Sequence, residues 1–173
     1  MITSLIWLVS CVFIIHDFEE IVVMERWLQK NEKDVLTKLP LKFHSYFQKL
    51  FPKHTAGFAL AVLVEYIVIM ICTFIAIFEK QHEWAVIGVL SIVSILFLHC
   101  FTNIGQSIML KSYTPGVFTA IILLIPFSLY FYHYVLTHQM IDWRMIWFSV
   151  PIGIIILVTF NQLGLFLGKK LEK

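Results

Sequence analysis

Residues 55–78 read TAGFALAVLVEYIVIMICTFIAIF, an apolar run that only one acidic residue, Glu65, interrupts. A helix needs about 20 predominantly apolar residues to cross the hydrocarbon core of a bilayer. Three later blocks, at about 84–110, 115–136 and 145–167, are similarly long and apolar. The sequence therefore predicts an all-α membrane helix bundle, in which each of these blocks crosses the bilayer.

The overall composition agrees with this class. Of 173 residues, 60% are hydrophobic and 14% are charged, with a mean hydropathy of +0.86, whereas soluble domains have roughly 25% charged residues. The blocks are continuously apolar, which excludes a transmembrane β-barrel, because barrel strands alternate in polarity. We expect one domain over residues 1–173. The net charge of +2 is too small to favour nucleic acid as a partner.

The amino-terminal block predicts one more span. The apolar run from Ile2 to Ile15 is too short to cross a bilayer, and it reaches the required length only by continuing through residues 16–20, HDFEE, to Met24. No basic segment precedes this block and no small-residue cleavage site follows it, so we do not expect a removable signal peptide. The prediction is about five transmembrane helices, with residues 2–24 as the first.

The distribution of basic residues predicts the orientation. Lysine and arginine are frequent in the connection 25–54, after the third span and in the tail: Arg26, Lys30, Lys33, Lys38, Lys42, Lys49, Lys53, Lys111, Lys169, Lys170 and Lys173. The opposite connections offer Lys80 and Arg144. Because cytoplasmic loops are rich in Lys and Arg, we expect a multi-pass protein of the cell membrane with its amino terminus outside and its carboxyl terminus in the cytoplasm. Segment 39–51 has apolar residues at helical spacing, so it is either an interfacial helix or a basic surface loop.

Three ionisable residues share one face of the first predicted span. His16, Glu19 and Glu20 stand at positions i, i+3 and i+4. A charged side chain at the centre of a membrane helix costs roughly 2.5–3.5 kcal/mol, so two carboxylates need a cation or protons. The alternative is that these side chains extend to the interface, because the polar connection follows soon after Met24.

Two more ionisable residues are expected at a similar depth. Glu65 and His99 each lie about ten residues from the cytoplasmic end of their helices, or roughly 15 Å. Together with His16, Glu19 and Glu20 they predict a metal site suited to Zn, Fe or Mn. Amide side chains at the same level predict interhelical hydrogen bonds that support the site: Asn103, Gln106, Asn161 and Gln162.

The last two spans carry signals of local structure. The fourth opens with Tyr113-Thr114-Pro115-Gly116, in which Thr114 is expected to cap the helix, and Pro126 is expected to kink it. In the fifth, Gly164 and Gly168 have the GxxxG spacing that permits close helix contact. This pair predicts a possible homodimer face.

The pentad at residues 16–20 resembles the HXXEE family of integral membrane proteins, which is named after this motif. His99-x-x-x-Asn103 and the segment 113–116 fit the same family, and the likeness covers most of the chain. The resemblance implies a membrane location and an intramembrane polar site, without implying an activity.

Three functions are compatible with these residues. The leading hypothesis is a metal-dependent intramembrane enzyme acting on a lipid-soluble substrate that enters from the membrane lipid. The second is a proton- or cation-coupled transporter, in which the buried carboxylates and imidazoles relay the ion. The third is a membrane scaffold or accessory subunit, for which the polar site would not be needed.

Overall fold

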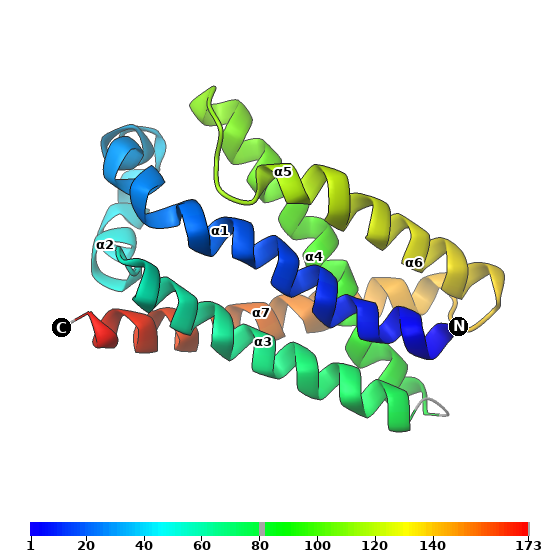
Figure 1. Cartoon of the computed structure of the whole chain (residues 1–173). Coiled ribbons are helices and arrows are strands. Elements are labelled where there is room, and N and C mark those ends of the chain that lie inside the picture. The colour runs from blue at the N-terminus through cyan, green and yellow to red at the C-terminus, as the bar shows by residue number, and fades with distance from the viewer. Residues whose placement is uncertain (80–81, 173) are drawn as a thin grey trace.

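The computed structural model describes residues 1–79 and 82–172, and all the regular elements in these ranges are helical (Figure 1). Lys80 and Lys173, which enter the charge argument, lie outside the described residues. The all-α bundle is therefore confirmed. In chain order its elements are α1 (Ile2–Lys38), α2 (Leu41–Leu50), α3 (Thr55–Phe78), α4 (Glu83–Leu110), α5 (Val117–Thr119), the π-helical turn η1 (Ala120–Leu124), α6 (Ile125–Thr137) and α7 (Trp143–Leu171).

The long helices lie side by side, with α3 packed between α1 and α7, and α7 also packed on α4. The chain termini lie at opposite ends of the bundle, and α2 lies at the end that holds the carboxyl terminus (Figure 1). Four helical segments of the described chain are long and apolar enough to cross a membrane: Thr55–Phe78, Glu83–Leu110, Val117–Thr137 and Trp143–Leu171. α1 is not one of these four.

The first helix is longer than the segment 2–24 that we assigned to the membrane. It continues to Lys38 because residues 25–38 are mostly good helix formers and contain neither glycine nor proline. Pro40 then ends the helical path, and α2 begins at Leu41. The connection 25–54 is therefore largely helical. All of α2 is at least partly exposed, and its placement at the membrane interface stays a prediction.

The start of α3 is held by carboxylates from two other helices. Oε2 of Glu25 in α1 accepts hydrogen bonds from the backbone N–H of Thr55 at 2.7 Å and from its hydroxyl at 2.8 Å. Oε1 of Glu172, just after α7, accepts from the backbone N–H of His54 at 2.7 Å. Helix amino termini have unpaired N–H groups and attract negative charge. The hydrogen bonds from Thr55 and then from His54 lower the pKa of Glu25 to about 2.

Glu25→Gln is expected to lower the thermal unfolding midpoint at pH 6. It is also expected to make this midpoint less sensitive to a fall in pH. The carboxylate of Glu25 stabilises the fold above pH 4.5, its ordinary pKa, and this contribution is lost as the pH falls from 4.5 toward 2. We expect the decrease in midpoint between pH 6 and 3.5 to be smaller in the variant than in the wild type. Unfolding of the detergent-solubilised protein at both pH values measures this, and an unchanged midpoint and pH dependence would contradict it.

Gly164 and Gly168 make the close helix contact that their spacing permits, and they make it within the chain. Both are buried against α3. A Cβ atom on Gly164 would lie 2.7 Å from the carbonyl oxygen of Ala61, and one on Gly168 would overlap the carbonyl oxygen of Gly57. A homodimer through these two glycines would have to displace α3.

The fourth long segment is irregular before Pro126, where we expected a kink. Pro126 stands in the first turn of α6, and the wider π-helical turn η1 directly precedes it. Proline lacks an N–H and its ring clashes with the preceding turn of an α-helix, so a wider turn accommodates it.

Candidate metal centre

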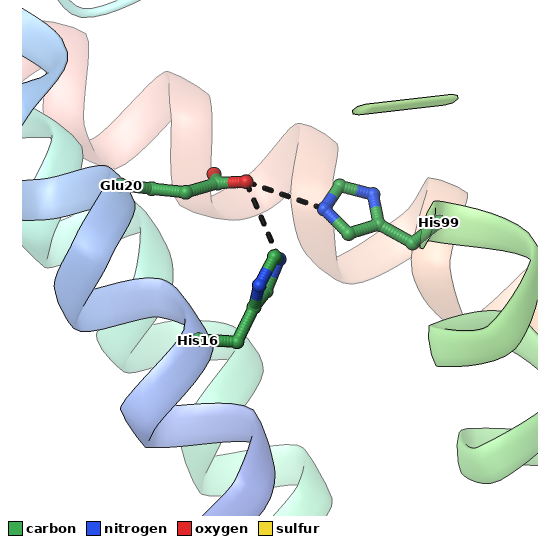
Figure 2. Close-up of side chains that lie close together, drawn as sticks. All are labelled: His16, Glu20 and His99. Atoms are coloured by element: carbon green, nitrogen blue, oxygen red, sulfur yellow. Dashed lines mark hydrogen bonds and ion pairs between the residues drawn. The ribbon is translucent and has the colours of Figure 1, made fainter. Parts of the chain in front are cut away.

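The two faces that carry the predicted site meet between α1 and α4. Oε1 of Glu20 lies 3.4 Å from Nε2 of His16, one helical turn away, and 3.4 Å from Nε2 of His99 on α4. Figure 2 shows one oxygen of this carboxylate joined by dashed lines to both rings. His16 is 1% exposed and Glu20 is 8% exposed. The sequence-predicted face of α1 therefore brings two of its three members to this cluster.

The separations within the cluster fit a metal ion. One ligand atom from each of His16, Glu20 and His99 can be chosen so that all lie within 4.8 Å of one another. Ligand atoms held about 2.1 Å from a tetrahedral metal lie about 3.4 Å apart, which matches the separations of Glu20 Oε1 from the two imidazole nitrogens. Two imidazoles with one carboxylate suit zinc and non-haem iron. The donor set therefore fits a transition metal.

Asn103 completes the cluster from the next turn of α4. Its amide nitrogen Nδ2 lies 3.0 Å from Oε1 of Glu20, 3.4 Å from Nε2 of His16 and 3.3 Å from Nε2 of His99. Asn103 is buried. Rotation of the amide by half a turn would present its oxygen, which is a metal-ligand atom, to the same space.

Glu19 points away from this cluster and acts on His16 through Thr119. Its Oε2 accepts from the hydroxyl of Thr119 at 2.5 Å and from the Thr119 backbone N–H at 2.8 Å. Because the single hydroxyl proton of Thr119 goes to Glu19, its Oγ1 accepts from Nδ1 of His16 at 2.8 Å. In this tautomer the ring of His16 carries its proton on Nδ1, and the lone pair on Nε2 can accept from Nδ2 of Asn103 at 3.4 Å.

The segment before α5 lies over the cluster. Thr114 does not cap the helix as we expected: it is buried, and its hydroxyl donates to the carbonyl oxygen of Asn103 at 3.2 Å. Gly116 is the N-cap instead, with a φ of 81°. Glu19 supplies the negative charge at this helix start, through the N–H groups of Phe118 and Thr119. The hydroxyl of Thr114 is used in this contact with α4, which the local sequence does not indicate.

Tyr113, in the same segment, reinforces the position of Glu19. Its hydroxyl donates to Oε1 of Glu19 at 2.6 Å. Burial and this neighbouring carboxylate raise the pKa of Tyr113, which keeps the hydroxyl protonated as a donor. Tyr113 thus has a specific partner on α1.

The remaining predicted residues lie outside the three-residue cluster. Oε1 of Glu65 accepts from Nδ2 of Asn161 on α7 at 2.7 Å, which is an interhelical hydrogen bond of the predicted kind. Nε2 of Gln162 donates to the hydroxyl of Tyr46 on α2 at 2.5 Å. Gln106 is exposed on α4. Glu65, Asn161, Gln162 and Gln106 all line one cavity, which also borders the cluster.

This cavity has a volume of about 510 Å³ and is lined mainly by apolar side chains. Glu20, His99 and Asn103 form part of its wall. Sites for small molecules are concave, largely apolar and typically of 300–1,000 Å³, with a few polar groups. The candidate metal centre therefore borders a space suited to an apolar molecule.

Sequence reasoning missed Asp17 and Thr119. Asp17 is 6% exposed and lines the cavity. Its position inside the charged pentad was a signal, since it is another acidic residue at the same depth. Thr119 had no such signal, because its link to Glu19 joins residues 100 positions apart in the chain.

Comparison with known families agrees with the motif. The family described as "Protein of unknown function with HXXEE motif" matches residues 7–131. The chain belongs to the HXXEE family. The matched range of this HXXEE protein includes the three-residue cluster, Asn103, Thr119 and both acidic cavity residues Asp17 and Glu65. Asn161 and Gln162 lie beyond it. No curated protein and no solved structure matches the chain.

Within this HXXEE protein the three fixed letters of the motif have different surroundings. The histidine, His16, and the second glutamate, Glu20, face His99. The first glutamate, Glu19, bonds the Thr119 hydroxyl that in turn accepts from His16. The spacing of the motif thus places His16 and Glu20 in the cluster, while Glu19 contacts it indirectly through Thr119.

Proposed function

We propose that this HXXEE-family protein is a metal-dependent membrane enzyme that acts on a lipid-soluble substrate. His16, Glu20 and His99 are the ligands in this proposal. The observation that carries it is the convergence of their three ligand atoms, from two helices, at the wall of a largely apolar cavity. A cluster that served packing alone would not need a space of about 510 Å³ beside it.

A bound Zn, Fe or Mn ion would supply a Lewis acid or an activated oxygen ligand at this wall. The protein's own residues have separate tasks in the proposal. Thr119 and Glu19 hold the His16 ring in the tautomer whose Nε2 is free to bind a cation. Hydrogen-bonded partners of this kind orient metal-ligating histidines. The apolar walls of the cavity exclude water and hold the substrate.

The proposal narrows the ligand set predicted from the sequence. Glu19 becomes a positioning residue, because its oxygens bond Tyr113, Phe118 and Thr119. Glu65 becomes a cavity residue, because Asn161 binds it. Asn103 is the residue placed to provide a fourth ligand atom.

The proposed membrane arrangement has five spans, with α1 as the first. In support, α1 packs against α3 and α4, which are both apolar enough to cross a bilayer. Termini at opposite ends of the bundle agree with an odd number of crossings (Figure 1). We place α2 and the carboxyl terminus in the cytoplasm and the amino terminus outside, in the cell membrane, following the basic residues.

Metal analysis tests the proposal. Protein purified in detergent, without immobilised metal and without chelator, is expected to contain about one equivalent of zinc, iron or manganese. Dialysis against a chelator should remove the metal, and reconstitution should restore it. Less than about a tenth of an equivalent of any transition metal, with no recovery on reconstitution, would overturn the proposal.

A further inference from the structure

Asp17 is a buried carboxyl group whose oxygen Oδ2 has no hydrogen-bond partner among the described residues. The side chain is 6% exposed. Asp17 lines the cavity beside the candidate metal centre, but it is not one of the three clustered ligands. A buried polar atom without a hydrogen-bond partner destabilises the fold, and more so if it is charged. This oxygen therefore marks a place where a ligand atom would be stabilised.

The cavity wall is acidic around this oxygen. Asp17, Glu20 and Glu65 all line it, and like charges on Glu20 and Glu65 would repel one on Asp17. Within the described parts of the chain, no lysine or arginine lines the cavity. Glu20 already contacts two imidazoles, and His99 in the same wall also attracts Glu65, whereas no lysine or arginine of the described wall reaches Asp17. A positive charge is the missing partner.

The rest of the wall is apolar on both sides of these carboxylates. Along α1, Phe13 lies one turn before Asp17, while Met24, Trp27 and Leu28 follow toward the α2 end, and all four line the cavity. A ligand that fills this space needs hydrocarbon as well as a charged group. Because apolar lining residues lie on both sides of Asp17 along α1, the charged group of a ligand bound to Asp17 would lie inside the cavity and not at the membrane surface.

We propose that the cavity binds an amphiphile with a protonated amine and a hydrocarbon chain, as the substrate class of the proposed enzyme. The ammonium group donates a hydrogen bond to Oδ2 of Asp17 and lies near Glu65, and the chain packs among the apolar residues. The description of the amine as a substrate rests on the proposed function. The binding itself depends only on the cavity.

The alternatives to an amine fit the wall less well. A fatty acid or a phosphate would add negative charge to a low-dielectric space whose wall already has three carboxyl side chains. A neutral alcohol could bond Asp17 but would bring no positive charge to the acidic wall. Hydrogen bonds in which a partner is charged are roughly twice as strong as those between neutral partners.

Binding of three probes that differ only in the head group tests the proposal. Dodecylamine, dodecanol and dodecanoate, each radiolabelled, are titrated against the protein in nanodiscs of zwitterionic lipid, with empty nanodiscs subtracted. We expect dodecylamine to bind at least about tenfold more tightly than either other probe. We expect Asp17→Asn and Glu65→Gln each to reduce that preference at least about threefold.

Two controls make the outcome specific. Glu83→Gln removes an exposed carboxylate of α4 that does not line the cavity, and it should keep the full amine preference. Glu65→Gln keeps an acceptor for Asn161, so it serves as a test even if Asp17→Asn fails to fold. Equal binding of the three probes, or an amine preference that both cavity variants retain, would overturn the proposal.

The test separates the ligand from the metal. Binding is measured before and after treatment with a chelator, and the amine preference is expected to survive. A protein that prefers the amine but contains no metal would overturn the proposed enzyme and leave the ligand class standing. A metal-containing protein with no amine preference would overturn the ligand class alone.

Discussion

Glu20→Gln is expected to abolish metal binding, with the metal content falling from about one equivalent to less than about a tenth. Glu20 supplies the carboxylate that lies 3.4 Å from both imidazoles, and an amide provides neither its charge nor its ligand strength. Two neutral imidazoles would remain beside an uncompensated cation in a buried site. Elemental analysis per mole of protein, after dialysis at equal free metal concentration, measures the effect.

Two further variants are expected to have a smaller effect on metal binding or none. Thr119→Val removes the acceptor for Nδ1 of His16 and leaves the three ligands in place, so we expect a 10- to 100-fold weaker metal affinity and not a complete loss. Glu83→Gln, at an exposed position on the same α4 helix, should retain the wild-type metal content. Retention of a full equivalent by Glu20→Gln would remove this residue from the site.

Gly116→Ala is expected to disrupt the same site from the other side. Gly116 has a φ of 81°, a conformation that costs a residue with a side chain roughly 1–2 kcal/mol. A Cβ atom there would overlap Oε1 of Glu20 and lie 2.6 Å from Nδ2 of Asn103 and 2.9 Å from Cε1 of His16. Overpacking adds about 1–3 kcal/mol. We expect a loss of about 2–5 kcal/mol in unfolding free energy, together with loss of the metal.

Gly105→Ala is the matched control for this substitution. Gly105 also lies close to Asn103 in sequence, but a Cβ atom there would meet no described atom within 4 Å. Alanine is favoured over glycine inside a helix by roughly 0.5–1 kcal/mol, so this variant should be as stable as the wild type or slightly more stable. Thermal unfolding and metal content of the two variants, measured side by side, check both expectations. Equal behaviour of Gly116→Ala and Gly105→Ala would contradict the close packing at Gly116.

The sequence predicted the parts of the fold that depend on local composition. The helix at 55–78 has the bounds expected from its apolar run, and the one expected at 84–110 begins one residue earlier. The helical spacing within α1 and α4 also placed His16 with Glu20, and His99 with Asn103, on faces that meet in the structure. Their role as metal ligands stays a prediction. The helix positions and the shared faces are predictable because continuous apolar length and a period of 3.6 residues are properties of one segment.

The contacts that the sequence did not predict depend on partners from elsewhere in the chain. Glu19 and Glu20 are adjacent, so their side chains point about 100° apart around the helix, and only the position of α5 determines that Glu19 faces Thr119. Thr114 has the character of a cap, yet the nearby carbonyl of Asn103 accepts its hydroxyl proton. Local sequence gave no sign of either contact.

The hydrogen bonds of Thr119 have a consequence for biosynthesis. As the chain leaves the ribosome, His16 and Glu20 emerge first and His99 completes the trio once α4 has been made. Thr119 follows only with the next segment, and until it docks, nothing from that segment holds the proton of His16 on Nδ1. A nascent chain that ends before residue 117 would thus contain all three proposed ligands and still bind metal weakly. Tight metal binding would therefore indicate that the α5 segment has docked against α1.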